Sequence, residues 1–443
     1  MKALLDKVSA ALPPGTVAVA GGTVVLGAAS YVHLGVAGHS LSSDAMANVS
    51  VLWTIVMSVG IGVFFPIEQE LTRIVAARAV LGQGAAPVLR RATLLTAGML
   101  GATLLVLGLG AAPLADLLFR GDRSLVAALG GAFTGMAVCY LTRGVLAGLG
   151  RFGAYGVQLA VDGGLRIVLA FGCALLGLHS ALAFSLVLAV APVAAMLVTL
   201  PVLLRAAGPG EDIAWRELTG GLGLLICSTL LSQVVVNAAV MSTKLLAPTD
   251  SALIGALLNA LVLARVPLFV FGSLQASLLG GLTAAYTAGD RAAFSAMLRR
   301  IGVVVLLLGL AGGVPATAFG PWLIEVLFDA CPVLGCLDFF LLSAGTVAYM
   351  FAMVLGQALM VFKRHHLQLL CWAVGAAVLV AVTFAPGDVA LRVILAYALG
   401  SLATVLGMLT VLRLGFPGAA PGTAEGPGRE VAASPLGART VGE

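Results

Sequence analysis

The chain has 443 residues, of which 60% are hydrophobic and only 10% are charged, and its formal net charge is +5. Soluble globular domains carry roughly 25% charged residues, so this composition excludes a soluble fold. Apolar runs of about 20 residues, the length that an α-helix needs to cross a bilayer, recur along the chain. The sequence therefore predicts an all-α integral membrane protein. Its basic residues are scattered between the apolar runs, so we expect no nucleic-acid partner.

The apolar runs predict twelve transmembrane helices. Residues 1–15 hold Lys2, Asp6 and Lys7 and are predicted to be a cytoplasmic amphipathic segment. An N-lobe over 16–204 contains spans at 16–38, 45–66, 93–113, 125–146, 157–177 and 180–204. A cytoplasmic linker at 205–218 leads to a C-lobe over 219–413, with spans at 219–241, 252–274, 301–321, 337–361, 368–385 and 390–413. The Pro-, Gly- and Ala-rich tail at 414–443 is predicted to be disordered.

Arginine and lysine gather in the connections that follow the even-numbered spans. Arg143 and Arg151, which flank the turn after the fourth span, follow this pattern. Because cytoplasmic loops carry an excess of Lys and Arg, we expect both termini in the cytoplasm of a plasma (inner) membrane protein. At the end of the fourth span, the spacing of Gly144 and Gly148 allows another helix to approach closely.

The two halves of the chain match at a constant shift of 209 residues. Arg90 and Arg91 fall on Arg299 and Arg300, and LADLLF (114–119) falls on LIEVLF (323–328). With six spans in each half, both halves enter the membrane from the same side. The sequence therefore predicts two pseudo-symmetric six-helix lobes around a central cavity.

Three segments resemble a known family: RGVLAGLGRFGAYGVQLAVDGGLRIVLA (143–170), VVVNAAVMSTKLL (234–246) and IGALLNALVLARVPLFVFGSLQASLLGGLTAAY (254–286). They are similar to the polysaccharide-repeat (Wzx-type) flippases of the multidrug/oligosaccharidyl-lipid/polysaccharide (MOP) exporter superfamily. The resemblance implies a MATE-like fold, a lipid-linked glycan substrate of the undecaprenyl-pyrophosphate type, and polysaccharide polymerase machinery as a partner. The superfamily also contains multidrug exporters and lipid II flippases, which remain alternatives.

Arg265 lies about 13 residues into the eighth span, near the bilayer midplane at roughly 1.5 Å per residue. A guanidinium there offers five donors that match phosphate oxygens, so Arg265 is the first candidate for substrate binding. Pro267 frees backbone carbonyls close by and is a candidate for gating. The alternative is that Arg265 pairs with a polar neighbour or extends toward water. At the matching place of the N-lobe stands Val56, so the fold itself demands no charge there.

Further charged residues lie in the N-lobe. Asp162 and Arg166 are four residues apart on one helix face, and form either a structural ion pair or part of the cavity. Asp162 is the deep carboxylate that an ion-coupled drug exporter needs. Glu68, Glu70 and Arg73 close the second span at its cytoplasmic end, as part of a gate or as solvated charges.

Amide side chains and cysteines complete the candidates. Gln233, Asn237 and Asn259 lie in the seventh and eighth spans, where amides bind sugar hydroxyls or other helices equally well. Cys331 and Cys336 share an outward loop in which a disulfide is geometrically open. The six cysteines show no metal-ligand spacing, so no metal is expected.

The sequence holds no HExxH, no Walker A loop, no GxSxG elbow and no large extramembrane segment. We therefore expect no enzyme, no catalytic residue and no cofactor. The predicted function is flipping of a lipid-linked oligosaccharide to the outer leaflet by alternating access. The alternatives are an ion-coupled exporter of amphipathic molecules, a lipid II flippase and, more distantly, a membrane polysaccharide polymerase, whose usual large outward loop is missing here.

Overall fold

The computed structural model describes residues 16–246, 257, 260, 261, 263, 264, 266–328 and 333–414. Within these ranges the chain forms helices and short connections, without a strand. The predicted N-terminal segment at 1–15 and nearly all of the predicted tail lie outside the described residues.

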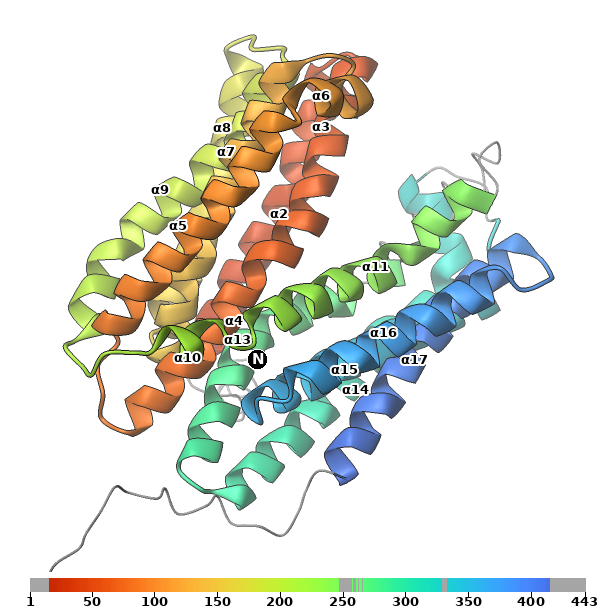
Figure 1. Ribbon diagram of the computed structural model, residues 1–443. Helices are drawn as coiled ribbons and strands as arrows, with labels where there is room; N and C mark the ends of the chain where they lie inside the picture. The colour runs from red at the N-terminus through yellow and green to blue at the C-terminus, as the bar shows by residue number, and fades with distance from the viewer. Residues whose placement is uncertain are drawn as a thin grey trace, which may run out of the picture.

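The N-lobe contains α2 (Thr16–Ser40), α3 (Ser43–Ile55), a π-helical turn η1 (Val56–Gly60), α4 (Ile61–Val80), α5 (Ala86–Leu109), α6 (Ala111–Phe119), α7 (Arg123–Gly148), α8 (Phe152–Leu175) and α9 (Ala181–Ala207) (Figure 1). The C-lobe contains α11 (Leu222–Leu246), α13 (Val266–Thr287), α14 (Arg291–Phe328), α15 (Cys336–Val361), α16 (His365–Thr383) and α17 (Val389–Leu414). The short helix α10 (Trp215–Thr219) lies between the lobes in sequence.

In the described part of the chain, 11 helices are long and apolar enough to cross a membrane. They match all the predicted spans except the eighth, whose end at 266–274 overlaps the start of α13. The helix at the second predicted span is much longer than predicted, because α3, η1 and α4 form one continuous helix from Ser43 to Val80. The prediction ended this span before its charged residues, whereas the helix continues through them.

Each half of the chain has its own hydrophobic core. One cluster of buried apolar side chains runs from Val19 to Leu222, and the other from Leu225 to Leu412. The buried core is therefore divided into two clusters, with the change between Leu222 and Leu225. Helix α6 ends at Phe119 and α14 ends at Phe328, which keeps the shift of 209 residues.

The predicted linker at 205–218 packs on the N-lobe. The Arg78 guanidinium donates a hydrogen bond to the backbone carbonyl of Glu211 (2.6 Å), and the Ala86 amide donates to the carbonyl of Gly208 (3.0 Å). Ile213 and Leu218 belong to the N-lobe core. The linker is thus bonded to the N-lobe up to α10.

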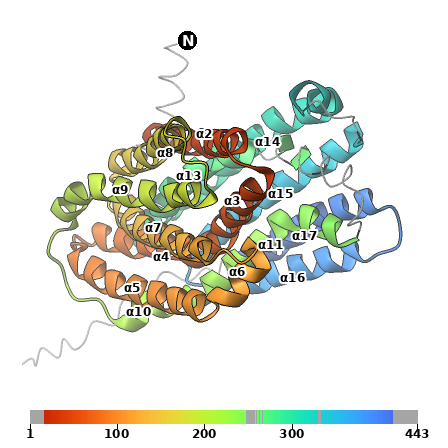
Figure 2. The same ribbon diagram turned by 90° about the horizontal axis from the view of Figure 1, so that it is seen from above.

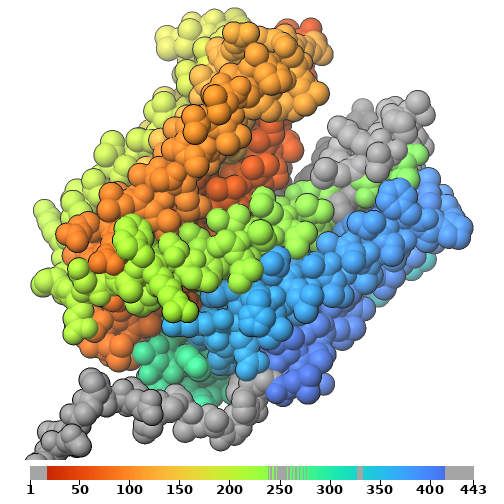
Figure 3. Space-filling model, in the orientation of Figure 1, coloured from red at the N-terminus to blue at the C-terminus, as the bar shows by residue number. Residues whose placement is uncertain are grey.

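The lobes meet at one end and diverge toward the other (Figure 1). Helix α4 packs against α11 and α13, with Gly62 against Leu230, and Gly280 of α13 faces Thr72. The contact end holds the last residues of α4, α7 and α15, which the sequence predicts to be cytoplasmic. At the opposite end a notch opens between the N-lobe and the C-lobe (Figure 3).

Candidate functional site

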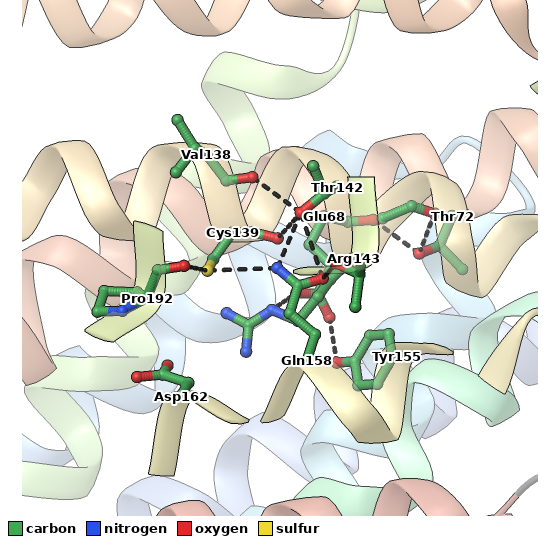
Figure 4. A network of polar contacts seen from close by, with 12 residues as sticks. Glu68, Thr72, Val138, Cys139, Thr142, Arg143, Tyr155, Gln158, Asp162 and Pro192 are labelled. Carbon is green, nitrogen blue, oxygen red and sulfur yellow. Dashed lines mark hydrogen bonds and ion pairs between the residues drawn. The ribbon is translucent and has the colours of Figure 1, made fainter. Parts of the chain in front are cut away.

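A group of buried polar side chains joins α4, α7 and α8 inside the N-lobe (Figure 4). The Tyr155 hydroxyl donates a hydrogen bond to Glu68 Oε1 (2.7 Å), and Arg143 Nε lies 3.3 Å from Glu68 Oε2. The guanidinium carbon of Arg143 lies 4.6 Å from the centroid of the Tyr140 ring. Glu68 is 3% exposed and Arg143 is 8% exposed. A charged pair this deeply buried is stable only because each charge has a close partner.

The approach of α7 to α4 positions this cluster. A Cβ atom on Gly144 would lie only 2.8 Å from the backbone oxygen of Glu68, and one on Gly148 would lie 2.6 Å from the Val75 side chain. The Thr72 hydroxyl bridges the same contact by bonding the carbonyls of Glu68 (2.7 Å) and Gly144 (3.2 Å). The close helix approach predicted from the two glycines is therefore present, and it places Arg143 beside Glu68.

The second polar group follows one face of α8 beyond Tyr155. Gln158 Nε2 donates to the Thr142 hydroxyl of α7 (2.9 Å), and the Thr199 hydroxyl of α9 donates to Gln158 Oε1 (3.2 Å). One turn further, Arg166 donates to Asp162 through Nε (2.8 Å) and Nη2 (3.2 Å). Tyr155, Gln158, Asp162 and Arg166 are all buried, so α8 turns a continuous polar face into the N-lobe.

The ion pair between Asp162 and Arg166 has the geometry that the i, i+4 spacing predicts. His33 of α2 extends the polar face, although sequence reasoning missed it. Its side chain is fully buried against Phe184, and neither ring nitrogen has a hydrogen-bond partner. Nothing in the spacing of the surrounding apolar residues marks His33.

The expectation that Glu68, Glu70 and Arg73 end the second span is wrong. All three lie within α4 and are buried, because each charge finds a partner inside the protein. Arg73 forms an ion pair with Glu70, with Nε at 3.0 Å from Oε2. The charges of this pair act on His365 at the start of α16 in the C-lobe.

Arg143 also differs from its predicted place. The sequence assigns it to the flank of a cytoplasmic turn, whereas its guanidinium lies inside the N-lobe against Glu68 and Tyr140. Only Arg151 lies at the exposed turn between α7 and α8. The long side chain of Arg143 reaches inward because a buried carboxylate is available, whereas Arg151 is exposed at the surface.

The predicted C-lobe residues are described only in part, and Arg265, Asn259 and Cys331 lie outside the described residues. Gln233 is half-buried in α11, and its backbone carbonyl accepts a hydrogen bond from Asn237 Nδ2 (2.9 Å). Pro267 is buried near the start of α13, where it packs against Gly312 of α14.

Cys336 is exposed at the start of α15, and its pairing with Cys331 stays a prediction. Across the described ranges, no group of three or more His, Cys, Asp or Glu side chains is placed to hold a metal ion.

No protein-family model and no curated protein matches the chain. Solved structures do match it. The chain resembles the Vibrio cholerae MATE transporter VcmN in its bent form, with a TM-score of 0.74 and 16% identity over 90% of this chain and 96% of that one. A MOP superfamily transporter from Pyrococcus furiosus gives a TM-score of 0.74 and 14% identity over 90% and 94% of the two chains.

A multidrug resistance MATE family transporter in an outward-facing conformation gives a TM-score of 0.71 and 16% identity over 90% of this chain and 95% of that one. The protein is therefore a multi-pass membrane protein with the all-α fold of MATE transporters in the MOP superfamily. The TM-scores establish the fold. Because the identities are low, the substrate has to be inferred from the site.

Proposed function

We propose that the protein is a membrane exporter that flips a lipid-linked oligosaccharide from the cytoplasmic to the outer leaflet by alternating access. The observation that carries this proposal is the charge pairing inside the N-lobe. Each of the buried carboxylates in the described part of the chain lies with an arginine: Glu68 with Arg143, Glu70 with Arg73, and Asp162 with Arg166. A carboxylate that is already neutralised is a poor site for a coupling cation.

The substrate's own charge then supplies the driving force. An inside-negative potential favours outward movement of an anion by about 2.3 kcal/mol per charge per 100 mV. The head group crosses between the two lobes while the polyprenyl tail stays in the bilayer. Arg265 pairs with the pyrophosphate, and Gln233, Asn237 and Asn259 contact the sugars. The lobes rock so that the end closed in this structure opens toward the cytoplasm.

The fold tolerates more than one pocket chemistry, which supports a substrate other than a drug. In the Pyrococcus furiosus transporter, the binding pocket has a reverse polarity that suggests a different function for that protein. An anionic head group is a reasonable substrate for a chain whose deep candidate residues are arginines and amides. A polysaccharide polymerase acting on the flipped product fits this role as a partner.

The test uses the full chain in proteoliposomes that contain an undecaprenyl-pyrophosphate oligosaccharide and carry a potassium diffusion potential. We expect the oligosaccharide to become accessible to lectin in the opposite leaflet only when the protein is present. The movement should be faster when the potential on the receiving side is positive, because that side attracts the anionic head group. Arg265→Ala should abolish this movement, whereas Arg299→Gln, at an exposed site, should preserve it. Full activity of Arg265→Ala, or indifference to the potential, refutes the proposal.

A second candidate, an ion-coupled exporter of amphipathic small molecules, is favoured by one observation. The Glu68 carboxylate accepts a hydrogen bond from the neutral Tyr155 hydroxyl and pairs with Arg143. If Arg143 moves away, Glu68 is the group that takes up a proton. In this case dye export should follow a proton or sodium gradient, and both Glu68→Gln and Asp162→Asn should uncouple it. Export of dye that ignores both gradients excludes this candidate.

A further inference from the structure

A groove of about 620 Å³ lies at the periphery of the N-lobe, between the start of α5 and α10. Its lining residues are Arg90, Arg91, Thr93, Leu94 and Trp215. Figure 2 shows α10 beside α5 at the periphery of the N-lobe. The groove shares no lining residue with the buried cluster of α4, α7 and α8, and the proposed transport does not use it.

The groove has more positive charge than its surroundings neutralise. Arg91 Nη2 lies 3.5 Å from Asp212, whose side chain is 69% exposed, so this ion pair is weak and solvated. Arg90 is exposed, and no carboxylate in the described part of the chain forms an ion pair with it. Both arginines line the groove, and their guanidinium groups offer the forked donors that bind phosphate oxygens.

An aromatic ring and an apolar surface complete the groove. The guanidinium carbon of Arg91 lies 5.7 Å from the centroid of the Trp215 ring, which is 46% exposed. Tryptophan is enriched at the level of lipid head groups, where its ring contacts both hydrocarbon and water. Beyond the arginines, α5 exposes Leu94 and Leu105 to the surroundings, which is the surface that acyl chains cover.

From this arrangement we propose that the groove binds the phosphate head group of an anionic phospholipid, with the acyl chains lying along α5. The site faces the side that the sequence predicts to be cytoplasmic, and basic pockets at this level recognise such head groups. A lipid held by Arg90, Arg91 and Trp215 bridges α5 and α10. It therefore joins the body of the N-lobe to the last helix before the C-lobe.

The internal repeat supplies a matched control. Arg299 and Arg300 occupy the same place in α14 and are exposed, and no aromatic ring of the described residues stacks on either. If charge alone attracted the lipid, both dibasic pairs would bind equally. The groove with Trp215 predicts that only the first pair does.

The experiment measures binding of a spin-labelled phosphatidylglycerol to the full-length protein in phosphatidylcholine nanodiscs. We expect Arg90→Gln and Arg91→Gln to weaken binding about fivefold each, which corresponds to about 1 kcal/mol per charge. Trp215→Ala should weaken it further, and Trp215→Phe should retain most of it. Arg299→Gln with Arg300→Gln should leave it unchanged. Thermal unfolding in phosphatidylcholine alone confirms that each variant is folded.

Two results overturn the proposal. The first is equal loss of phosphatidylglycerol in the α5 and α14 variants, since this means unspecific attraction to basic helix ends. The second is complete displacement of the labelled lipid by glycerol 3-phosphate at millimolar concentration, since the groove would then take a free phosphate ester instead of a membrane lipid. Resistance to glycerol 3-phosphate, together with the selective loss in the α5 variants, supports the lipid site.

Discussion

Removing the positive charge of the buried cluster provides the sharpest test of the N-lobe interior. In Arg143→Met the side chain keeps much of its length, but the Glu68 carboxylate retains only the Tyr155 hydroxyl at 2.7 Å. Breaking a buried ion pair by removing one partner costs about 3–5 kcal/mol, because the other charge stays buried without compensation. Tyr155→Phe removes a single hydrogen bond to a charged group, so it should cost about 1.5–3 kcal/mol.

The double variant Glu68→Gln with Arg143→Met removes both charges and should be more stable than the sum of the single changes predicts. We expect a coupling energy of about 2–3 kcal/mol, near the upper range for residues in one network. Reversible unfolding in mixed lipid and detergent micelles, followed by tryptophan fluorescence, measures each corner of the cycle. Single effects that add within about 0.5 kcal/mol would refute the reasoning, since they would mean that the two charges do not interact.

Three further predictions concern packing. Gly144→Ala should lower the free energy of unfolding by about 1–3 kcal/mol, because its Cβ would meet the α4 backbone at 2.8 Å. Gly164→Ala has open space around its Cβ and should be neutral or slightly stabilising in the same unfolding assay. Gly221→Ala should lower the thermal midpoint because its Cβ would meet the His365 ring at the start of α16, while Gly223→Ala, with nothing nearby, should not. Equal midpoints would contradict the close contact between Gly221 and α16. His33→Phe should cost less than about 1 kcal/mol because no hydrogen bond is lost, and a larger loss of stability would reveal a polar partner of the ring.

The helical architecture was predictable because the bilayer forces every spanning backbone to satisfy its own hydrogen bonds. Long apolar runs and the basic connections between them therefore mark the spans directly. The pair of Asp162 and Arg166 was predictable for a similar reason, since helical periodicity alone brings residues four apart together. The repeat, visible from Arg90 and Arg299, indicated the two lobes.

The cluster of Glu68, Arg143 and Tyr155 was not predictable in this way. Its members come from three helices, and no periodicity within one helix relates them. Charges at the end of an apolar run usually mark the water boundary, which is where the sequence pattern places Glu68 and Arg143. The glycine pair in α7 did signal a close helix contact, but it did not identify the partner helix.

The attachment of the linker to the N-lobe determines where relative rotation has to occur. Hydrogen bonds from the Arg78 guanidinium and the Ala86 backbone amide fix the linker, and α10 continues it to Thr219. Helix α11 begins at Leu222, so only Gly220 and Gly221 lie between the two helices. The covalent connection between the lobes is therefore limited to two glycines, and Gly221 packs closely against His365 of α16.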